Sequence, residues 1–254
     1  MCLLALLYRA VDGAPLLVAA NREEYFDRPF LPPHVQGEKR RFLAGLDVRA
    51  GGTWLGVNDA GLVAAVTNRP KTKVPAQPRS RGLLCRELLE FATAADAADH
   101  ARRELLGGYY AGANYVVADA RFGSIFEAGD DLVETPLTPG LHLVTNGSAN
   151  DRHDSRQELA REMFAAAAVS DVASFLVTAR RVCMQGPDAQ SRSIIVRLPE
   201  RGTVSSTLLA ITAHADEAVC HFAPGPPDVT PYQDYTSELR RLLGWANRPP
   251  PEYR

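Results

Sequence analysis

The sequence predicts an α+β protein in which helices cover the outer faces of antiparallel sheets. Apolar stretches of strand length and helix length follow one another as strands, a helix pair, strands, a second helix pair and final strands. Because the helices come in consecutive pairs instead of alternating singly with strands, a doubly wound βαβ fold is disfavoured. Hairpin signals between neighbouring strands indicate that the pairing is antiparallel.

Four strands are predicted in the first seventy residues, where short apolar runs alternate with Gly, Asn and Asp. The last two are joined by Asn58-Asp59-Ala60-Gly61, whose residue types tolerate the positive φ of tight hairpin loops. The four predicted strands are Cys2–Arg9, Pro15–Ala20, Gly52–Val57 and Gly61–Asn68.

The period of the apolar residues becomes helical after Ser80, an N-cap residue, and stays helical as far as Phe91. A second helix is predicted from Thr93 to Leu106, where Gly107-Gly108 ends it.

The second half of the chain repeats this order, and we expect one domain over residues 1–246 followed by a proline-rich tail, 247–254. Its predicted strands are Ala113–Asp119, Ser124–Ala128, Leu141–Thr145, Ser193–Leu198, Ser205–Thr212 and Ala218–Phe222, and its predicted helices are Asp151–Ala168 and Ser170–Val182.

Composition narrows the function classes. The 254 residues are 46% hydrophobic and 23% charged, which is typical of a packed globular chain. With 28 basic and 30 acidic residues the net charge is −2, so we expect no nucleic-acid partner. No apolar run approaches the ~20 residues that span a bilayer, which argues against membrane insertion. Four cysteines without a CxxC pair indicate reduced thiols and a cytoplasmic protein.

The common nucleotide, zinc and serine-hydrolase motifs (GxGxxG, GxxxxGK[ST], HExxH and GxSxG) do not occur in the sequence. The six histidines show no paired metal-ligand spacing. We therefore expect neither a metal nor a cofactor.

Cys2 is the first candidate for chemistry. Removal of Met1 would leave Cys2 with a thiol, whose ordinary pKa is about 8.5, and an α-amine, whose ordinary pKa is about 7.7 to 8.0. One residue would then supply both the nucleophile and its general base, as N-terminal threonine nucleophiles do. The alternative is an ordinary packed thiol.

Two apolar strands end in the same pair of residues, Thr67-Asn68 and Thr145-Asn146. Strand ends often carry site residues, and an Asn side chain can donate to the oxyanion that forms when a thiolate attacks an amide. Taken singly, each Asn also fits a turn-forming role.

Two charged segments adjoin these candidates. Asn21 to Arg28 follows the second strand, where a carboxylate could orient the N-terminal amine and a guanidinium could lower the thiol pKa. Taken alone, it also fits the start of a solvated loop. Arg69 to Arg81 holds five cations and no acid, which fits a solvated flap or, alternatively, the attraction of an anionic ligand.

Together these features resemble the NRDE family, also called the transport and Golgi organisation protein 2 family, named for an Asn-Arg-Asp-Glu motif after the second strand. That family is in turn similar to the N-terminal nucleophile (Ntn) hydrolases, especially penicillin V acylases and bile-salt hydrolases, which implies a four-layer αββα sandwich. The matching landmarks, in the family's order, are Met1-Cys2, Asn21–Glu24, Gly51–Asn58 with Gly61-Leu62, Thr67-Asn68, Thr145–Gly147 and Gly202–Thr207.

The resemblance implies a catalytic role for four residues. Cys2 would be the nucleophile, with its own amine as the base. Asn146 would be an oxyanion donor, with Asn68 as a second. Glu23 would take the place of the acid that the superfamily keeps near its nucleophile.

We expect Asn21, Arg22, Trp54 and Arg192 to contact the substrate. Arg192 is included because Val204 stands where many relatives have an arginine, and Arg192 is a substitute from the preceding segment. Two further departures are Glu23, which replaces the motif's Asp, and Ala20, which stands where the acylases have an arginine.

The function expected from these residues is an N-terminal-cysteine amidohydrolase that cleaves a non-peptide carbon–nitrogen amide bond through a thioester. Its partner would be a small acyl amide. The alternative is a non-catalytic protein that uses the same pocket to bind or move a hydrophobic ligand such as haem, a lipid or an acyl-coenzyme A. The sequence does not determine the oligomeric state.

Overall fold

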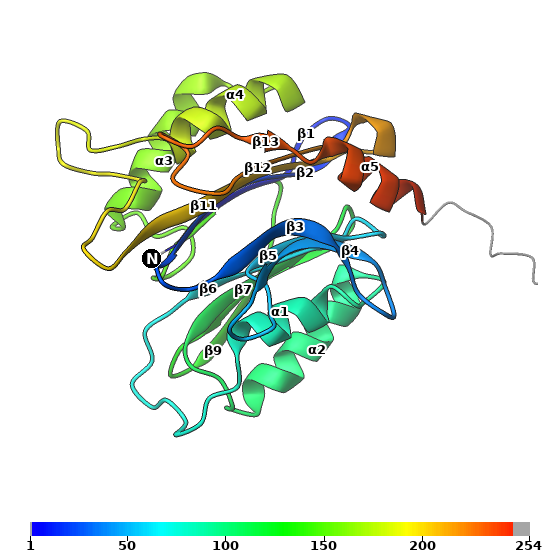
Figure 1. Ribbon diagram of the computed structural model, residues 1–254, viewed down its shortest axis with the longest axis vertical. Coiled ribbons are helices and arrows are strands. Elements are labelled where there is room, and N and C mark those ends of the chain that lie inside the picture. Colours follow the sequence, from blue (N-terminus) through cyan, green and yellow to red (C-terminus); the bar gives the residue numbers. More distant parts are fainter. Residues whose placement is uncertain (1, 246–254) are drawn as a thin grey trace, which may run out of the picture.

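Two antiparallel β-sheets lie one on the other with helices on both outer sides in the computed structural model, which describes residues 2–245 (Figure 1). The first sheet contains, in spatial order, β10 (Gly140–Val144), β1 (Leu3–Val11), β2 (Ala14–Tyr25), β11 (Arg201–Ile211), β12 (Val219–Ala223) and β13 (Gln233–Asp234). The second contains β3 (Phe30–Gln36), β4 (Phe42–Asp47), β5 (Leu55–Asn58), β6 (Val63–Asn68), β7 (Ala113–Ala118), β8 (Gly123–Ala128) and β9 (Leu132–Pro136).

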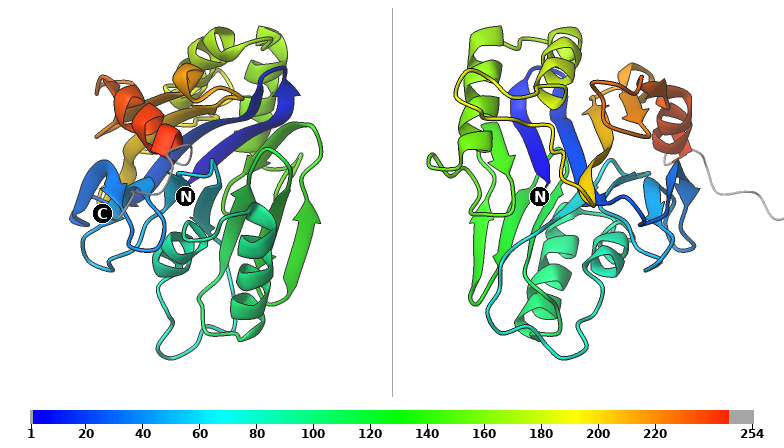
Figure 2. Two further views of the ribbon diagram at one scale, coloured as in Figure 1. Left: turned by 90° about the vertical axis from the view of Figure 1, so that its right-hand side faces the viewer. Right: turned by 60° about the vertical axis from the view of Figure 1, so that its left-hand side comes forward.

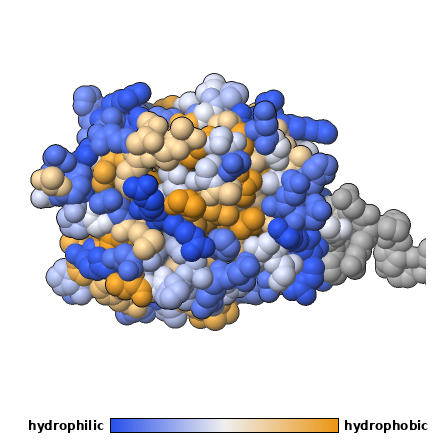
Figure 3. Space-filling view, turned by 90° about the horizontal axis from the view of Figure 1, so that it is seen from above, coloured by the Kyte–Doolittle hydropathy of each residue, from blue (hydrophilic) through white to orange (hydrophobic). Residues whose placement is uncertain are grey.

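Helix pairs form the outer layers (Figures 1 and 2). The pair α3 (Ser155–Ala167) and α4 (Val172–Cys183) packs on the first sheet, and α1 (Arg81–Leu88) and α2 (Ala94–Leu106) pack on the second. On the α3–α4 side, hydrophilic side chains separate the hydrophobic patches (Figure 3). The α+β class and the αββα layering expected from the sequence are therefore confirmed.

Strand β1 shows why its sequence reads as a continuous apolar run. Leu4 and Leu6 point into the core between the two sheets, whereas Leu3 and Ala5 point into the core beneath α3 and α4. Successive side chains of a strand point to opposite faces, so a strand buried on both faces needs apolar residues at every position.

Helix α5 (Thr236–Trp245) was not expected from the sequence. Its Leu239, Leu242 and Leu243 join the core between the sheets, so it closes one side of the sandwich. No helix within residues 2–245 is long and apolar enough to cross a bilayer. The predicted tail, 247–254, lies outside the described residues.

Several local predictions hold. Gly61 has a φ of +78° and donates its N–H to the Asn58 carbonyl, as the predicted hairpin turn requires. The Thr93 hydroxyl caps α2 by accepting the N–H of Asp96, and Gly108 follows the helix with a φ of +74°.

The predicted strand Ser193–Leu198 is wrong. The backbone N–H groups of Ile194 and Ile195 both donate to the carbonyl of Gln185, beyond the end of α4. Only an isolated bridge joins this segment to β11, between Arg197 and Gly202. Apolar side chains are buried here without a strand ladder, which hydropathy cannot distinguish from a strand.

Four strands were missed, β3, β4, β9 and the two-residue β13. Strand β3 contains Pro32-Pro33 and lies at the edge of its sheet, where proline is tolerated because one row of N–H groups is unpaired. Strand β4 contains Gly45, whose missing side chain makes room for the Trp54 ring, since an added Cβ would lie 2.5 Å from it.

Candidate active site

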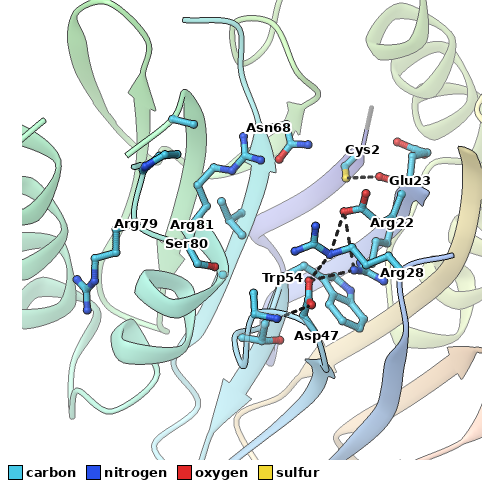
Figure 4. A pocket seen from close by; sticks show the side chains of 17 residues that line it. Cys2, Arg22, Glu23, Arg28, Asp47, Trp54, Asn68, Arg79, Ser80 and Arg81 are labelled. Atoms are coloured by element: carbon cyan, nitrogen blue, oxygen red, sulfur yellow. Dashed lines mark hydrogen bonds and ion pairs between the residues drawn. The ribbon is translucent and has the colours of Figure 1, made fainter. Parts of the chain in front are cut away.

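A cavity of about 370 Å³ lies where Cys2, the end of β2 and the end of β6 meet, with the segment before α1 as its far wall (Figure 4). Its lining therefore comes from both sheets. Of the residues singled out from the sequence, Cys2, Arg22, Glu23, Trp54 and Asn68 line it.

Cys2 directly precedes β1, and both its backbone N–H and its thiol make contacts. Its backbone N–H donates to Oδ1 of Asn146, at 3.0 Å, and its Sγ contacts the backbone carbonyl of Glu23, at 3.9 Å. Burial, followed by the negative charge of Glu23, raises the pKa of the Cys2 thiol to about 11. The thiol is therefore protonated at neutral pH, and a reaction at its sulfur needs a base.

A β-bulge of β11 lies opposite two neighbouring residues of β2 that line the cavity. The pairing of β11 with β2 shifts between Thr203, opposite Glu23, and Ser205, opposite Arg22. The extra residue is Val204, on β11. Bulges redirect side chains beside functional sites, and here Arg22 and Glu23 both line the cavity although they are adjacent.

Glu23 is paired with a residue that the sequence did not single out. Arg156 on α3 donates from Nη2 to Oε1 of Glu23, at 2.9 Å, and to the carbonyl of Ile194, at 2.8 Å. The two side chains are 2% and 11% exposed, so this ion pair is buried. Burial raises the pKa of Glu23 and the Arg156 charge opposes that rise.

The two Thr-Asn strand ends meet across the sheets. The Thr67 hydroxyl, on β6 of the second sheet, donates to the carbonyl of Thr145, just beyond β10 of the first, at 2.6 Å. Asn114 on β7 donates to the same carbonyl, at 3.0 Å. These bonds tie together the segments that carry Asn68 and Asn146.

Arg22 is fixed by rings and carboxylates. Its Cζ lies 4.1 Å from the centre of the Trp54 ring and 5.4 Å from that of Phe30. Its Nη2 pairs with Asp47, at 3.5 Å, and with Glu24, at 3.9 Å. Burial lowers the pKa of Arg22, and these carboxylates oppose that shift.

Two of the expected substrate contacts lie elsewhere. Asn21 donates from Nδ2 to the carbonyl of Cys183, at the end of α4, at 2.9 Å. Arg192 forms ion pairs with Glu162 and Asp188, both at 2.8 Å. Neither residue is part of the cavity lining.

Sequence reasoning missed Arg156, Asp47, Asn114 and the use of Arg81 in the lining. Arg156 follows the helix N-cap Asp154 and has the appearance of a surface helix residue. Asp47 ends a strand that was itself missed. A weak signal did exist for Asn114, because it is the one amide side chain in β7, whose other residues are apolar or aromatic.

A sequence model of the family described as Transport and Golgi organisation 2 matches residues 1–220 of the chain. The chain belongs to this family. The human family member, a Transport and Golgi organization protein 2 homolog, is 34% identical over 140 residues, which cover 52% of this chain and 50% of the human protein. The bovine homolog is 26% identical over 259 residues, covering 89% of this chain and 92% of the bovine one. The chain thus matches about half the length of the human relative and most of the bovine one.

Solved structures share the fold of this Transport and Golgi organisation 2 chain. A penicillin V acylase from Agrobacterium tumefaciens has a TM-score of 0.55 at 16% identity, covering 87% of this chain and 82% of the acylase. A Caenorhabditis elegans ortholog of N-acylethanolamine-hydrolyzing acid amidase also has a TM-score of 0.55, at 12% identity, covering 94% of this chain and 97% of the amidase. The fold is therefore that of the Ntn amidohydrolases, and the family resemblance is confirmed.

Proposed function

We propose that this protein is an N-terminal-cysteine amidohydrolase that cleaves linear, non-peptide amides. The observation that carries the proposal is the 3.0 Å hydrogen bond from the Cys2 nitrogen to Asn146, beside a cavity that Cys2 itself lines. When Met1 is removed, this nitrogen becomes the α-amine. Asn146 then orients the base next to the sulfur.

In the first half-reaction, the α-amine takes the proton of the Cys2 thiol while Sγ attacks the substrate carbonyl carbon. A base is required because burial keeps the thiol pKa at about 11. The carbonyl oxygen becomes an oxyanion, to which the amide groups of Asn68 and Asn146 donate in this scheme. Collapse breaks the carbon–nitrogen bond, the α-ammonium protonates the leaving amine, and a thioester remains on Cys2.

In the second half-reaction, the α-amine removes a proton from water, and the resulting hydroxide attacks the thioester carbon. The carbon–sulfur bond then breaks, the acid product leaves and the thiol is restored. Glu23 and Arg156 are positioning residues in this scheme. Their buried ion pair holds the β2 segment against which the Cys2 sulfur rests.

Two further observations support an amide as the substrate. The neighbours with a TM-score of 0.55 are named as a penicillin V acylase and as an N-acylethanolamine-hydrolyzing acid amidase. Among residues 2–245, Cys2 has the one thiol in the cavity lining, and this thiol stands next to a nitrogen that removal of Met1 would convert into an amine.

The test combines mass and turnover. Intact mass of the purified protein shows whether Met1 is removed. The protein is then incubated with a panel of N-acyl amides, and acyl adducts are sought on Cys2 by peptide mapping. Cys2→Ala should abolish both adduct and turnover, and Asn146→Ala should lower kcat by about 10²- to 10³-fold.

Cys85→Ala is the matched control, because Cys85 is a fully buried thiol of α1 outside the cavity lining, and its loss should leave turnover in place. Retention of Met1, or turnover that survives Cys2→Ala, contradicts the proposal. Ligand binding without any adduct on Cys2 would favour the alternative, a carrier of haem, lipid or acyl-coenzyme A.

A further inference from the structure

The five cations of residues 69–81 do not act as one basic surface. Arg69 forms an ion pair with Glu127, at 2.8 Å, and Arg79 pairs with Glu104, at 2.7 Å. Lys71 donates to a backbone carbonyl. Most of the charge that the sequence places in this segment is thus neutralised or directed away from the cavity.

Arg79 and Arg81 both line the cavity, but Arg79 pairs with Glu87 and Glu104, whereas Arg81 makes no ion pair within the described part of the chain. Its Nη1 donates to the carbonyl of Gly112, at 2.9 Å, and Glu24 acts on its charge through space without forming an ion pair with it. In Figure 4, Arg81 lies on the Asn68 side of the cavity, across from Cys2. Burial lowers the pKa of Arg81.

The cavity wall at Arg81 is also the start of α1. The first N–H groups of a helix have no intrahelical acceptor, and the partial positive charge there favours anions. Ser80 is the N-cap, but its side chain does not accept a hydrogen bond from the helix. Ser80, Arg81 and Gly82 all line the cavity.

Arg22 provides the second, independent observation. Its side chain is 5% exposed and lines the same cavity, and its buried Nη1 has no hydrogen-bond partner among residues 2–245. A buried donor without an acceptor is costly. An acceptor that enters the cavity would satisfy it.

The other charges of the cavity cancel. Arg22 and Arg28 face Glu24 and Asp47, with 2.7 Å between Arg28 and Asp47. Glu23 is paired with Arg156 outside the lining. The excess positive charge therefore lies at Arg81 and the α1 N-terminus.

We propose that Arg81, the N-terminus of α1 and Arg22 bind a carboxylate of the substrate, so that the preferred substrates are N-acyl amides that carry a carboxylate near the scissile bond. A carboxylate fits because it is planar and accepts from several donors, as guanidinium and backbone N–H groups require. This inference rests on the proposed amidohydrolase function. It adds the substrate class.

Binding is measured in Cys2→Ser protein, so that the result does not depend on turnover. The probes are N-octanoylglycine, with the carboxylate on the amine side, and N-octylsuccinamic acid, with it on the acyl side. Their neutral partners are N-octanoylglycinamide and N-octylsuccinamide. Calorimetry gives each Kd, and quenching of Trp54 fluorescence in a Trp245→Phe background reports that the probe enters the cavity.

At least one acid should bind about 10- to 100-fold more tightly than its neutral partner, as expected for charge-assisted hydrogen bonds. Arg81→Gln should reduce that preference to within about threefold while binding of the neutral probe stays the same. Arg22→Lys keeps the charge and should lose part of the preference. Arg102→Gln is the control, because Arg102 pairs with Glu134 outside the cavity lining.

Equal binding of acids and neutral partners, no binding of either acid, or a preference that survives both Arg81→Gln and Arg22→Lys overturns the inference. A clear preference for an acid that the wild-type protein never hydrolyses upholds the carboxylate subsite and contradicts the proposed function instead. Hydrolysis restricted to the neutral probes supports the proposed amidohydrolase function and contradicts the carboxylate subsite.

Discussion

Replacing Arg156 by Met should remove the ion pair that stabilises the buried carboxylate of Glu23. In the native protein the Glu23 carboxylate, 2% exposed, accepts a 2.9 Å hydrogen bond from Arg156. Removing one partner of a buried ion pair costs about 3–5 kcal/mol, because the other charge stays in a poorly solvating environment. The bond from Arg156 to the Ile194 carbonyl is lost as well, which adds about 1 kcal/mol at every pH.

The larger part of this loss should depend on pH. Burial already raises the pKa of Glu23, and Arg156 opposes that rise, so the variant has a still higher pKa. A carboxyl whose folded-state pKa is raised stabilises the fold below its unfolded pKa of about 4.3, and this contribution disappears as the pH rises through the folded pKa. The destabilisation should therefore shrink on acidification, by up to about 1.4 kcal/mol per pH unit.

Urea unfolding followed by circular dichroism measures the free energy of unfolding at about pH 5.5 and at about pH 8, two values above the unfolded pKa between which the contribution should change. The double variant Glu23→Gln/Arg156→Met should recover part of the stability and lose the pH dependence. Arg102→Met, which breaks an exposed ion pair with Glu134, should have a smaller effect. An equal loss for Arg156→Met at both pH values would refute the reasoning.

Three further outcomes are expected. Alkylation of Cys2 by iodoacetamide should be half-maximal near pH 11 in protein that retains Met1, and at lower pH once a free ammonium adjoins the sulfur; identical profiles would contradict this. Asn58→Ala should cost about 2–5 kcal/mol in urea unfolding, because the fully buried side chain makes four hydrogen bonds to backbone groups, and a loss below 1 kcal/mol would be too small. Gly52→Ala should lower the free energy of unfolding by about 1–3 kcal/mol, because the added Cβ would lie 2.2 Å from the Gly82 carbonyl carbon. Gly82→Ala should lower it less, because the added Cβ would lie 3.0 Å from the Thr53 carbonyl oxygen. A larger loss for Gly82→Ala than for Gly52→Ala would contradict this packing.

Much of the fold and part of the site follow from local chemistry. The doubly apolar β1, the Asn58 to Gly61 turn and the Thr93 cap depend on a few adjacent residues, so the sequence contains their whole cause. The same holds for Cys2 as a candidate.

The amino-acid sequence alone does not show which groups far apart in the chain become neighbours in the fold. Glu23 and Arg156 are 133 residues apart, and they meet only because α3 packs on the sheet that contains β2. The basic segment from Arg69 to Arg81 looks uniform in sequence, yet tertiary contacts neutralise Arg69 and Arg79 and leave Arg81 facing the cavity. The interaction between two charges depends on their distance and burial, which only the packed layers determine. Turn and strand preferences depend on neighbouring backbone atoms and side chains, so the local sequence determines them.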